Sequence, residues 1–99
     1  MKFGFIKVMA ASPKLKVGDP AFNLESAREC FDEAERMGAN RHVLPELHLT
    51  AYTCGDLFYS DTLLDGALEA LEALRDYTSG KRCMAVIGVP VRTGGKLYN

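Results

Sequence analysis

Several features that would identify a class of protein are missing from this sequence. Twelve basic and thirteen acidic residues give a net charge of -1, and lysine and arginine form no run. Such a surface has nothing to attract a phosphate backbone, so we expect no nucleic acid partner. No apolar stretch approaches the roughly 18 residues that a membrane helix needs, and the first residues lead into a strand-like segment rather than a signal peptide. We therefore expect no membrane partner and a cytoplasmic location.

Cysteine is scarce, and its spacing indicates no cross-links. Cys30, Cys54 and Cys83 are an odd number and form no C-x-x-C pair. This pattern argues against both a disulfide framework and a zinc knuckle. Free cysteines usually behave as small buried apolar residues, and we expect that behaviour here.

Motifs for phosphate and metal binding are also missing. The sequence has neither G-x-G-x-x-G nor G-x-x-x-x-G-K-[ST], so we expect no phosphate-binding loop. His42 and His48 are six residues apart, and together with Glu46 they do not form the H-E-x-x-H pattern of a helical zinc site. We expect no metal and no cofactor in this segment.

Apolar strand-like segments alternate with segments that have the pattern of amphipathic helices. Residues 2–10 and 83–91 are apolar almost throughout, which is typical of strands covered on both faces. Residues 41–44 are predicted to form a shorter strand that ends at Pro45.

Two helices are expected between these strands. Asn23 is placed to cap the first helix, which Gly38 ends. The second helix begins at Asp61 or Thr62 and ends near residues 79–80. The apolar positions that recur at helical spacing are Leu24, Ala27, Phe31 and Ala34 in the first helix and Leu64, Ala67, Leu68, Leu71 and Leu74 in the second.

The remaining segments are two long loops and a hairpin. The loops cover residues 11–22 and 47–60, and loops of this length are more often functional than not. Residues 93–96 contain two glycines, which suit a tight hairpin, and residues 97–99 begin a strand shorter than usual. The order strand, helix, strand, helix, strand, hairpin, strand predicts an α/β sheet with right-handed crossovers in one truncated domain, residues 1–99.

Glu46 is the first candidate for a functional residue. It follows an apolar strand that Pro45 stops, and Leu47 comes directly after it. A carboxylate at the end of a buried strand is costly unless it is paired or functional. Side chains at the carboxyl ends of parallel strands also face the crevice where open α/β sheets bind ligands. The simpler interpretation is a glutamate that caps the amides of the next loop.

The sequence around Glu46 resembles a known motif. Residues 44–52, L-P-E-L-H-L-T-A-Y, resemble the glutamate motif of the nitrilase or carbon-nitrogen hydrolase superfamily. Two further stretches, T-C-G-D-L-F at residues 53–58 and G-G-K-L-Y-N at residues 94–99, resemble more narrowly the amino-terminal glutaminase domain of glutamine-dependent NAD synthetases. Ala51 departs from the pattern, which has glycine there. A glycine at this position indicates close backbone approach or a positive φ.

The resemblance implies a fold and a role for Glu46. The fold would be an α-β-β-α sandwich of nitrilase type, of which this chain supplies the first half. Glu46 would be the general base that takes a proton from a cysteine thiol, so that the thiolate attacks the amide of glutamine. The catalytic lysine and the nucleophilic cysteine would lie outside this chain, since neither Cys54 nor Lys96 matches their positions. The resemblance places Tyr52 at the mouth of the substrate pocket, with plain packing as the alternative.

Cofactors and partners follow from the same resemblance. ATP and magnesium would bind a synthetase domain that this segment does not contain. The apolar inner face of the half-sheet would need a cover, so we expect a homo-oligomer through the exposed sheet face or the helices, exchanged strands, or a downstream segment. Two alternatives remain open. One is another amidase or carbamoylase of the superfamily, and the other is a small α/β module that oligomerises or binds a partner without catalysis.

Overall fold

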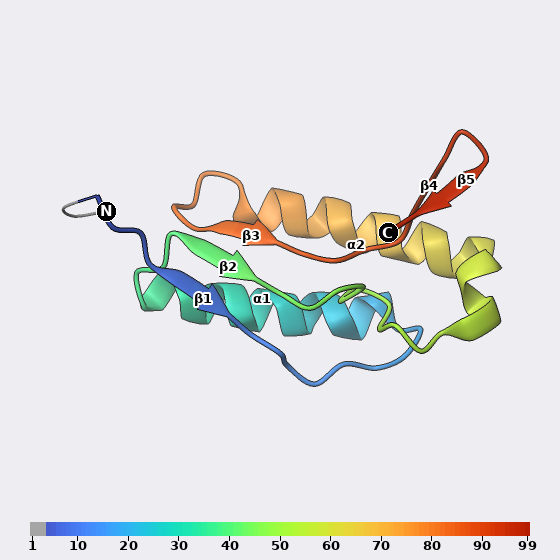
Figure 1. The fold of residues 1–99 in the computed structure, drawn as a ribbon, viewed down its shortest axis with the longest axis horizontal. Coiled ribbons are helices and arrows are strands. Elements are labelled where there is room, and N and C mark those ends of the chain that lie inside the picture. Colours follow the sequence, from blue (N-terminus) through green and yellow to red (C-terminus); the bar gives the residue numbers. More distant parts are fainter. Residues whose placement is uncertain (1–3) are drawn as a thin grey trace.

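The chain forms an α/β fold, in which a parallel sheet packs against two helices and a hairpin lies at one end, as the sequence predicts. The computed structural model describes residues 4–99 (Figure 1). The elements in chain order are β1 (Val8–Ala10), α1 (Pro20–Arg36), β2 (Arg41–Val43), the 3-10 helix η1 (Gly55–Tyr59), α2 (Asp61–Thr78), β3 (Met84–Val86), β4 (Val91–Thr93) and β5 (Lys96–Tyr98).

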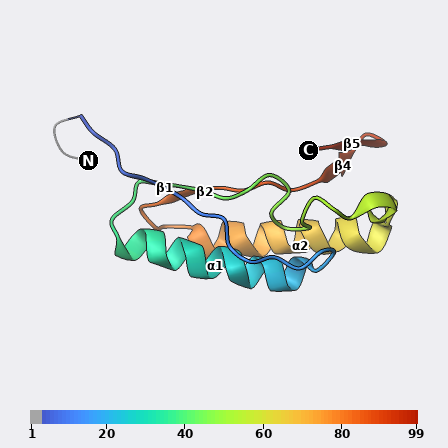
Figure 2. The same cartoon turned by 60° about the horizontal axis from the view of Figure 1, so that its bottom comes forward.

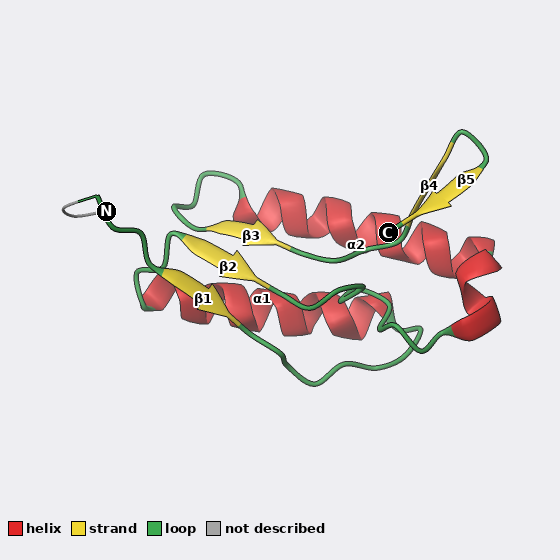
Figure 3. Cartoon of the chain, in the orientation of Figure 1, coloured by secondary structure: helices red, strands yellow, loops and turns green. Residues whose placement is uncertain are grey.

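The described strands β1, β2 and β3 form a parallel sheet in the order of the sequence. Ala10 lies beside Val43, and Val43 lies beside Val86. Helices α1 and α2 are the two crossover connections, and both lie on the same side of the sheet (Figure 2). Strands β4 and β5 pair antiparallel as a separate hairpin (Figure 3).

The core lies between this sheet and the two helices. Ala27, Phe31 and Ala34 of α1 are fully buried and Leu24 is half-buried, which agrees with the predicted apolar stripe of that helix. In α2 the prediction is confirmed in part, because Leu68 is 49% exposed and Leu71 is half-buried. The buried residues of α2 are Leu63, Leu64, Ala67, Ala70 and Leu74.

The other face of the sheet is apolar and open among residues 4–99, as expected for half of a sandwich whose inner face needs a cover. Val8, Val43, Met84 and Val86 are between 37% and 55% exposed, whereas the alternate residue His42 is fully buried against the helices. Both helices lie on one side, so among residues 4–99 nothing packs on the second apolar face. The strands are also shorter than predicted, and the beginning of the predicted first strand, residues 2–3, lies outside the described residues.

Helix α1 begins earlier than predicted, and Asn23 is not its cap. Asp19 is the N-cap, and its carboxylate accepts a hydrogen bond of 3.0 Å from the backbone amide of Phe22. Pro20 follows at the first helical position, where a missing N–H costs nothing. Asn23 is fully buried and instead bonds to the loop before the helix and to Leu49 O, at 3.0 Å.

The remaining boundaries agree closely with the sequence. Helix α2 begins at Asp61, and the Ser60 side chain caps it by accepting a hydrogen bond from Leu63 N. Gly94 and Gly95 both have positive φ, at 58° and 76°, as the predicted hairpin turn requires. The segment predicted as a long loop after Glu46 contains η1, which no periodic pattern signalled. No helix within residues 4–99 is long and apolar enough to cross a membrane.

Candidate functional site

Glu46 lies just beyond the carboxyl edge of the parallel sheet. Leu44 continues the line of β2, and its amide donates a 2.9 Å hydrogen bond to Val86 O. After Pro45 the chain turns away, which leaves the Glu46 side chain exposed at the sheet edge. Its Oε1 accepts a hydrogen bond of 2.7 Å from Nδ2 of Asn99. The structure therefore joins the end of β2 to the end of β5, two segments 53 residues apart in sequence.

A hollow of about 480 Å³ surrounds this contact. Its lining combines the carboxyl ends of β2 and β3 with the start of the hairpin: Leu44, Pro45, Glu46, Val86, Ile87, Gly88, Val89, Val91 and Asn99. Glu46 is the one ionisable side chain in this lining, and most of the others are apolar. A general base is most effective in a poorly solvated crevice, but Glu46 is exposed in this structure.

Gly88 holds the Glu46 segment close to β3. A Cβ at residue 88 would lie 2.2 Å from Leu47 N and 2.7 Å from Pro45 O, distances that no side chain could accept. The backbone of residues 45–47 therefore packs directly on glycine. On the same side, Leu49 N donates a 3.2 Å hydrogen bond to Gly88 O. Glu46 thus projects from a backbone segment fixed by a neighbouring strand.

Left-handed backbone conformations shape the turn that follows Glu46. Leu47 has φ 52° and Ala51 has φ 61°. Ala51 is the position where the resembled motif has glycine, and its positive φ gives the physical reason for that glycine. A residue with a Cβ occupies this region at a cost of roughly 1–2 kcal/mol.

Tyr52 and Cys54 lie further along the same loop. Tyr52 is 73% exposed and does not line the hollow around Glu46. Cys54 is buried, and its Sγ donates a hydrogen bond of 3.0 Å to Thr50 O. That contact gives the Cys54 thiol a packing role within the loop, as the sequence suggests.

A second, smaller hollow lies on the other side of Asn99. Its volume is about 280 Å³, and its lining is rich in aromatic side chains: Leu47, Gly55, Phe58, Tyr59, Pro90, Leu97, Tyr98 and Asn99. Phe58 and Tyr59 come from η1, whereas Tyr98 and Asn99 come from the hairpin. No spacing of residues in the sequence predicts that these two segments meet. Asn99 is the residue shared by the two hollows.

The two histidines near Glu46 in sequence belong to the core. His48 is fully buried, and its ring nitrogen Nε2 lies 2.9 Å from Asn23 O. His42 is fully buried beside Phe31, with ring centroids 6.3 Å apart, and within residues 4–99 neither of its ring nitrogens has a hydrogen-bond partner. Burial lowers the pKa of both histidines, and for His42 the nearby His48 lowers the pKa further. Within residues 4–99, no group of three or more His, Cys, Asp or Glu side chains could hold a metal ion.

These pKa shifts predict a loss of stability in mild acid. A histidine whose pKa is lowered in the folded state takes up its proton more readily when unfolded, so folding is favoured above the unfolded pKa of about 6.5 and weakened below it. We expect the free energy of unfolding to fall between pH 6.5 and 5 by up to about 1.4 kcal/mol per pH unit for each histidine. Urea denaturation across this range measures the slope.

Two variants separate this effect from the titration of carboxylates. His42→Leu and His48→Gln each remove one titrating group, and each should reduce the slope by about half. His42→Leu also removes two buried ring nitrogens that lack partners. An unchanged slope in the double variant would contradict the assignment to these histidines.

A parallel sheet with a carboxylate at its edge, next to a mostly apolar hollow, fits the class that the motif indicates. The family model for carbon-nitrogen hydrolases matches residues 8–99, and the chain belongs to this family. The match begins at β1 and includes every other element of the fold.

The relatives indicate a narrower group. A glutamine-dependent NAD(+) synthetase from Mycobacterium tuberculosis is 36% identical over 100 residues, which cover 97% of this chain and 14% of the relative. A protein of the same name from Oryza sativa subsp. indica is 39% identical over 82 residues, which cover 78% of this chain and 10% of the relative. The chain therefore spans about one seventh of the mycobacterial relative.

A solved structure gives the same result for the fold. The crystal structure of a glutamine-dependent NAD(+) synthetase from Cytophaga hutchinsonii superposes with a TM-score of 0.83 and 28% identity. The superposition covers 95% of this chain and 16% of that chain. The predicted α/β class, as the first part of a nitrilase-type fold, is confirmed.

Proposed function

We propose that this chain is part of the glutamine-hydrolysing domain of a glutamine-dependent NAD synthetase. The observation that carries the proposal is the position of Glu46 at the carboxyl edge of a parallel sheet, beside a hollow large enough for a small amide. Sequence similarity to such synthetases along 97% of the chain supports the choice of glutamine within the family.

The proposed role of Glu46 is that of general base. It accepts the proton of a cysteine thiol that lies outside this chain, and the thiolate attacks the side-chain amide carbon of glutamine. The proton from the thiol passes to the leaving nitrogen, so that ammonia departs and a thioester remains. Water then hydrolyses the thioester to glutamate and regenerates the thiol. Burial raises the pKa of the Cys30 and Cys83 thiols, and each pKa is raised further by a nearby carboxylate. Raised pKa values disfavour the thiolate, so neither of these two thiols is suited to be that nucleophile.

In the complete protein we expect the open face of the sheet to be covered. Val8, Val43, Met84 and Val86 give this face an apolar surface that is costly to leave in water. In the complete protein it packs against a second sheet, and the same cover reduces the exposure of Glu46. ATP and magnesium belong to a separate synthetase domain, and the protein is a cytoplasmic homo-oligomer. Tyr52 lines the mouth of the pocket once the domain is complete.

The test is ammonia release from glutamine by the complete protein that carries this chain. We expect release from glutamine to exceed release from asparagine and from simple aliphatic amides. We expect none from the 99-residue chain alone, which would lack the nucleophile and the lysine. Preferred hydrolysis of another amide would favour the alternative, a different amidase of the same family. Hydrolysis by the isolated chain would contradict the proposed division of the catalytic residues.

A further inference from the structure

We propose that Asn99 is a positioning residue for the carboxylate of Glu46. This inference rests on the proposed function, because it concerns the orientation of the proposed base. Asn99 Nδ2 donates a hydrogen bond of 2.7 Å to Glu46 Oε1, and Asn99 lines the same hollow as Glu46. Within residues 4–99 this is the one side-chain hydrogen bond that Glu46 makes.

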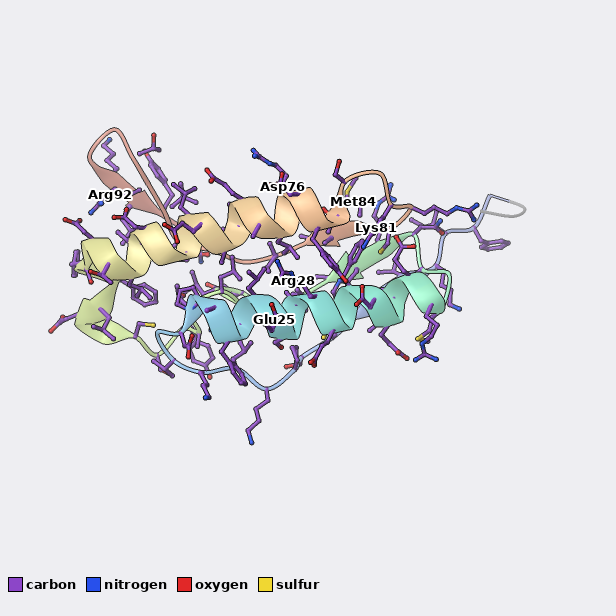
Figure 4. The ribbon with its side chains drawn as sticks, turned by 180° about the vertical axis from the view of Figure 1, so that it is seen from behind. Glu25, Arg28, Asp76, Lys81, Met84 and Arg92 are labelled. Carbon is purple, nitrogen blue, oxygen red and sulfur yellow. The ribbon has the colours of Figure 1, made fainter. Side chains whose placement is uncertain are left out.

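The hairpin that carries Asn99 is held in place by three features. Val91 pairs with Tyr98 across the hairpin, so residue 99 emerges directly beside the start of β4. Gly94 and Gly95 form the tight turn that sets this register. Arg92 forms an ion pair with Asp61 at the start of α2, and Figure 4 shows Arg92 beside this end of the helix. Asn99 therefore reaches Glu46 from an anchored element.

Glu46 is held from the opposite side by its own backbone. The contact of residues 45–47 with Gly88 fixes where the side chain begins, but it leaves the side-chain torsions of a glutamate free. An exposed glutamate samples several rotamers, and a general base must keep one of them. The hydrogen bond from Asn99 selects that rotamer.

The chemistry of an amide suits this role. The Asn99 side chain has no titrating proton, so its N–H group remains a donor at every working pH. It occupies one lone pair of Oε1 and leaves Oε2 free to accept the proton of the thiol. A donor to a carboxylate also favours the charged form, which is the form that acts as a base.

The experiment compares Asn99→Asp and Asn99→Ala with wild type in the complete protein. Asn99→Asp keeps the shape but replaces the donor with a carboxylate, and Asn99→Ala removes the group altogether. We expect kcat for glutamine hydrolysis to fall roughly 10-fold or more in both, with a change in KM of less than about 3-fold. We expect the acid limb of the pH profile to move to higher pH in both variants, by more in Asn99→Asp, because two carboxylates repel.

Asn40→Asp is the matched control. Asn40 lies at the opposite edge of the sheet, where its Oδ1 accepts a hydrogen bond of 2.9 Å from Lys7 N. Aspartate keeps that acceptor and introduces the same charge far from Glu46. We expect this control to leave the acid limb where it is in wild type.

The outcomes separate the two proposals. If wild type releases no ammonia from glutamine, the proposed function fails, and the role of Asn99 fails with it. If wild type is active and Glu46→Gln is inactive, but both Asn99 variants keep the wild-type kcat and acid limb, the role of Asn99 alone is overturned. Asn99 is exposed, so the folded structure should survive both substitutions, and Asn99→Ala decides the question if Asn99→Asp does not fold.

Discussion

Replacing Glu46 with glutamine should lower the rate of glutamine hydrolysis by the complete protein about 10²- to 10⁴-fold. Glutamine has the same shape, and its side-chain oxygen can still accept the hydrogen bond that Asn99 donates to Glu46 in this structure. The substitution therefore removes the ability to accept a proton and leaves the surroundings in place. The loss should appear mainly in kcat, because the base acts on the thiol rather than on the bound substrate.

A second glutamate gives the control for this prediction. Glu72 is exposed on α2, away from the sheet edge, and it forms no ion pair among the described residues 4–99. Glu72→Gln makes the same chemical change on the surface, and its activity should stay within about 2-fold of wild type, as surface substitutions usually have small effects. Ammonia release measured at saturating glutamine compares the three proteins. More than a tenth of wild-type activity in Glu46→Gln would exclude Glu46 as the general base.

Hydrophobic spacing was sufficient to predict the helices. In α1 the residues that recur at helical spacing include Ala27, Phe31 and Ala34, and all three are fully buried. The N-terminal boundary was less accurate, because Asn23 and Asp19 can both cap a helix. Pro20 settles the choice for Asp19, since proline is favoured at the first position of a helix and Asn23 is needed to hold a loop.

Continuous apolar runs overestimated the length of the strands. Residues 83–91 are apolar throughout, but the ladder of β3 covers Met84–Val86 alone. Continuous apolar character reports burial on two faces and says little about where backbone pairing ends. One of those faces is open among residues 4–99, so Val86 is 48% exposed despite its apolar surroundings in sequence. The pattern is thus consistent with a sheet that has a second layer in the complete domain.

Only part of the candidate site could be predicted from the sequence. Glu46 could be found because Pro45 ends a strand locally and a charged residue follows at once. Asn99 meets Glu46 through a contact that spans 53 residues, and no local pattern encodes such a distance. The sequence around Gly88 indicates its role only weakly: a glycine inside an apolar strand often marks a place where another backbone segment approaches closely. The structure was needed to show that the approach is made by the Glu46 segment itself.

Gly88→Ala should be the most destabilising single-methyl change in the segment around Glu46. The new Cβ would lie 2.2 Å from Leu47 N and 2.8 Å from Glu46 C, and both are backbone atoms that cannot rotate away. Overpacking of a fixed site costs typically 1–3 kcal/mol and occasionally more, and we expect about 3 kcal/mol here because the overlap is with backbone. The displaced segment carries Glu46, so glutamine hydrolysis should fall together with stability.

Gly66→Ala is the matched control, since it adds the same methyl group to a different glycine. Gly66 lies inside α2, where a Cβ would meet Pro20 Cγ at an ordinary contact distance of 3.5 Å. Alanine is a better helix former than glycine by about 1 kcal/mol, so this variant should be more stable than wild type. Urea denaturation should therefore separate the two alanine variants by about 4 kcal/mol in the free energy of unfolding. Equal stability of the two variants would mean that the Glu46 segment moves away from residue 88 at little cost, and that Gly88 does not fix its position.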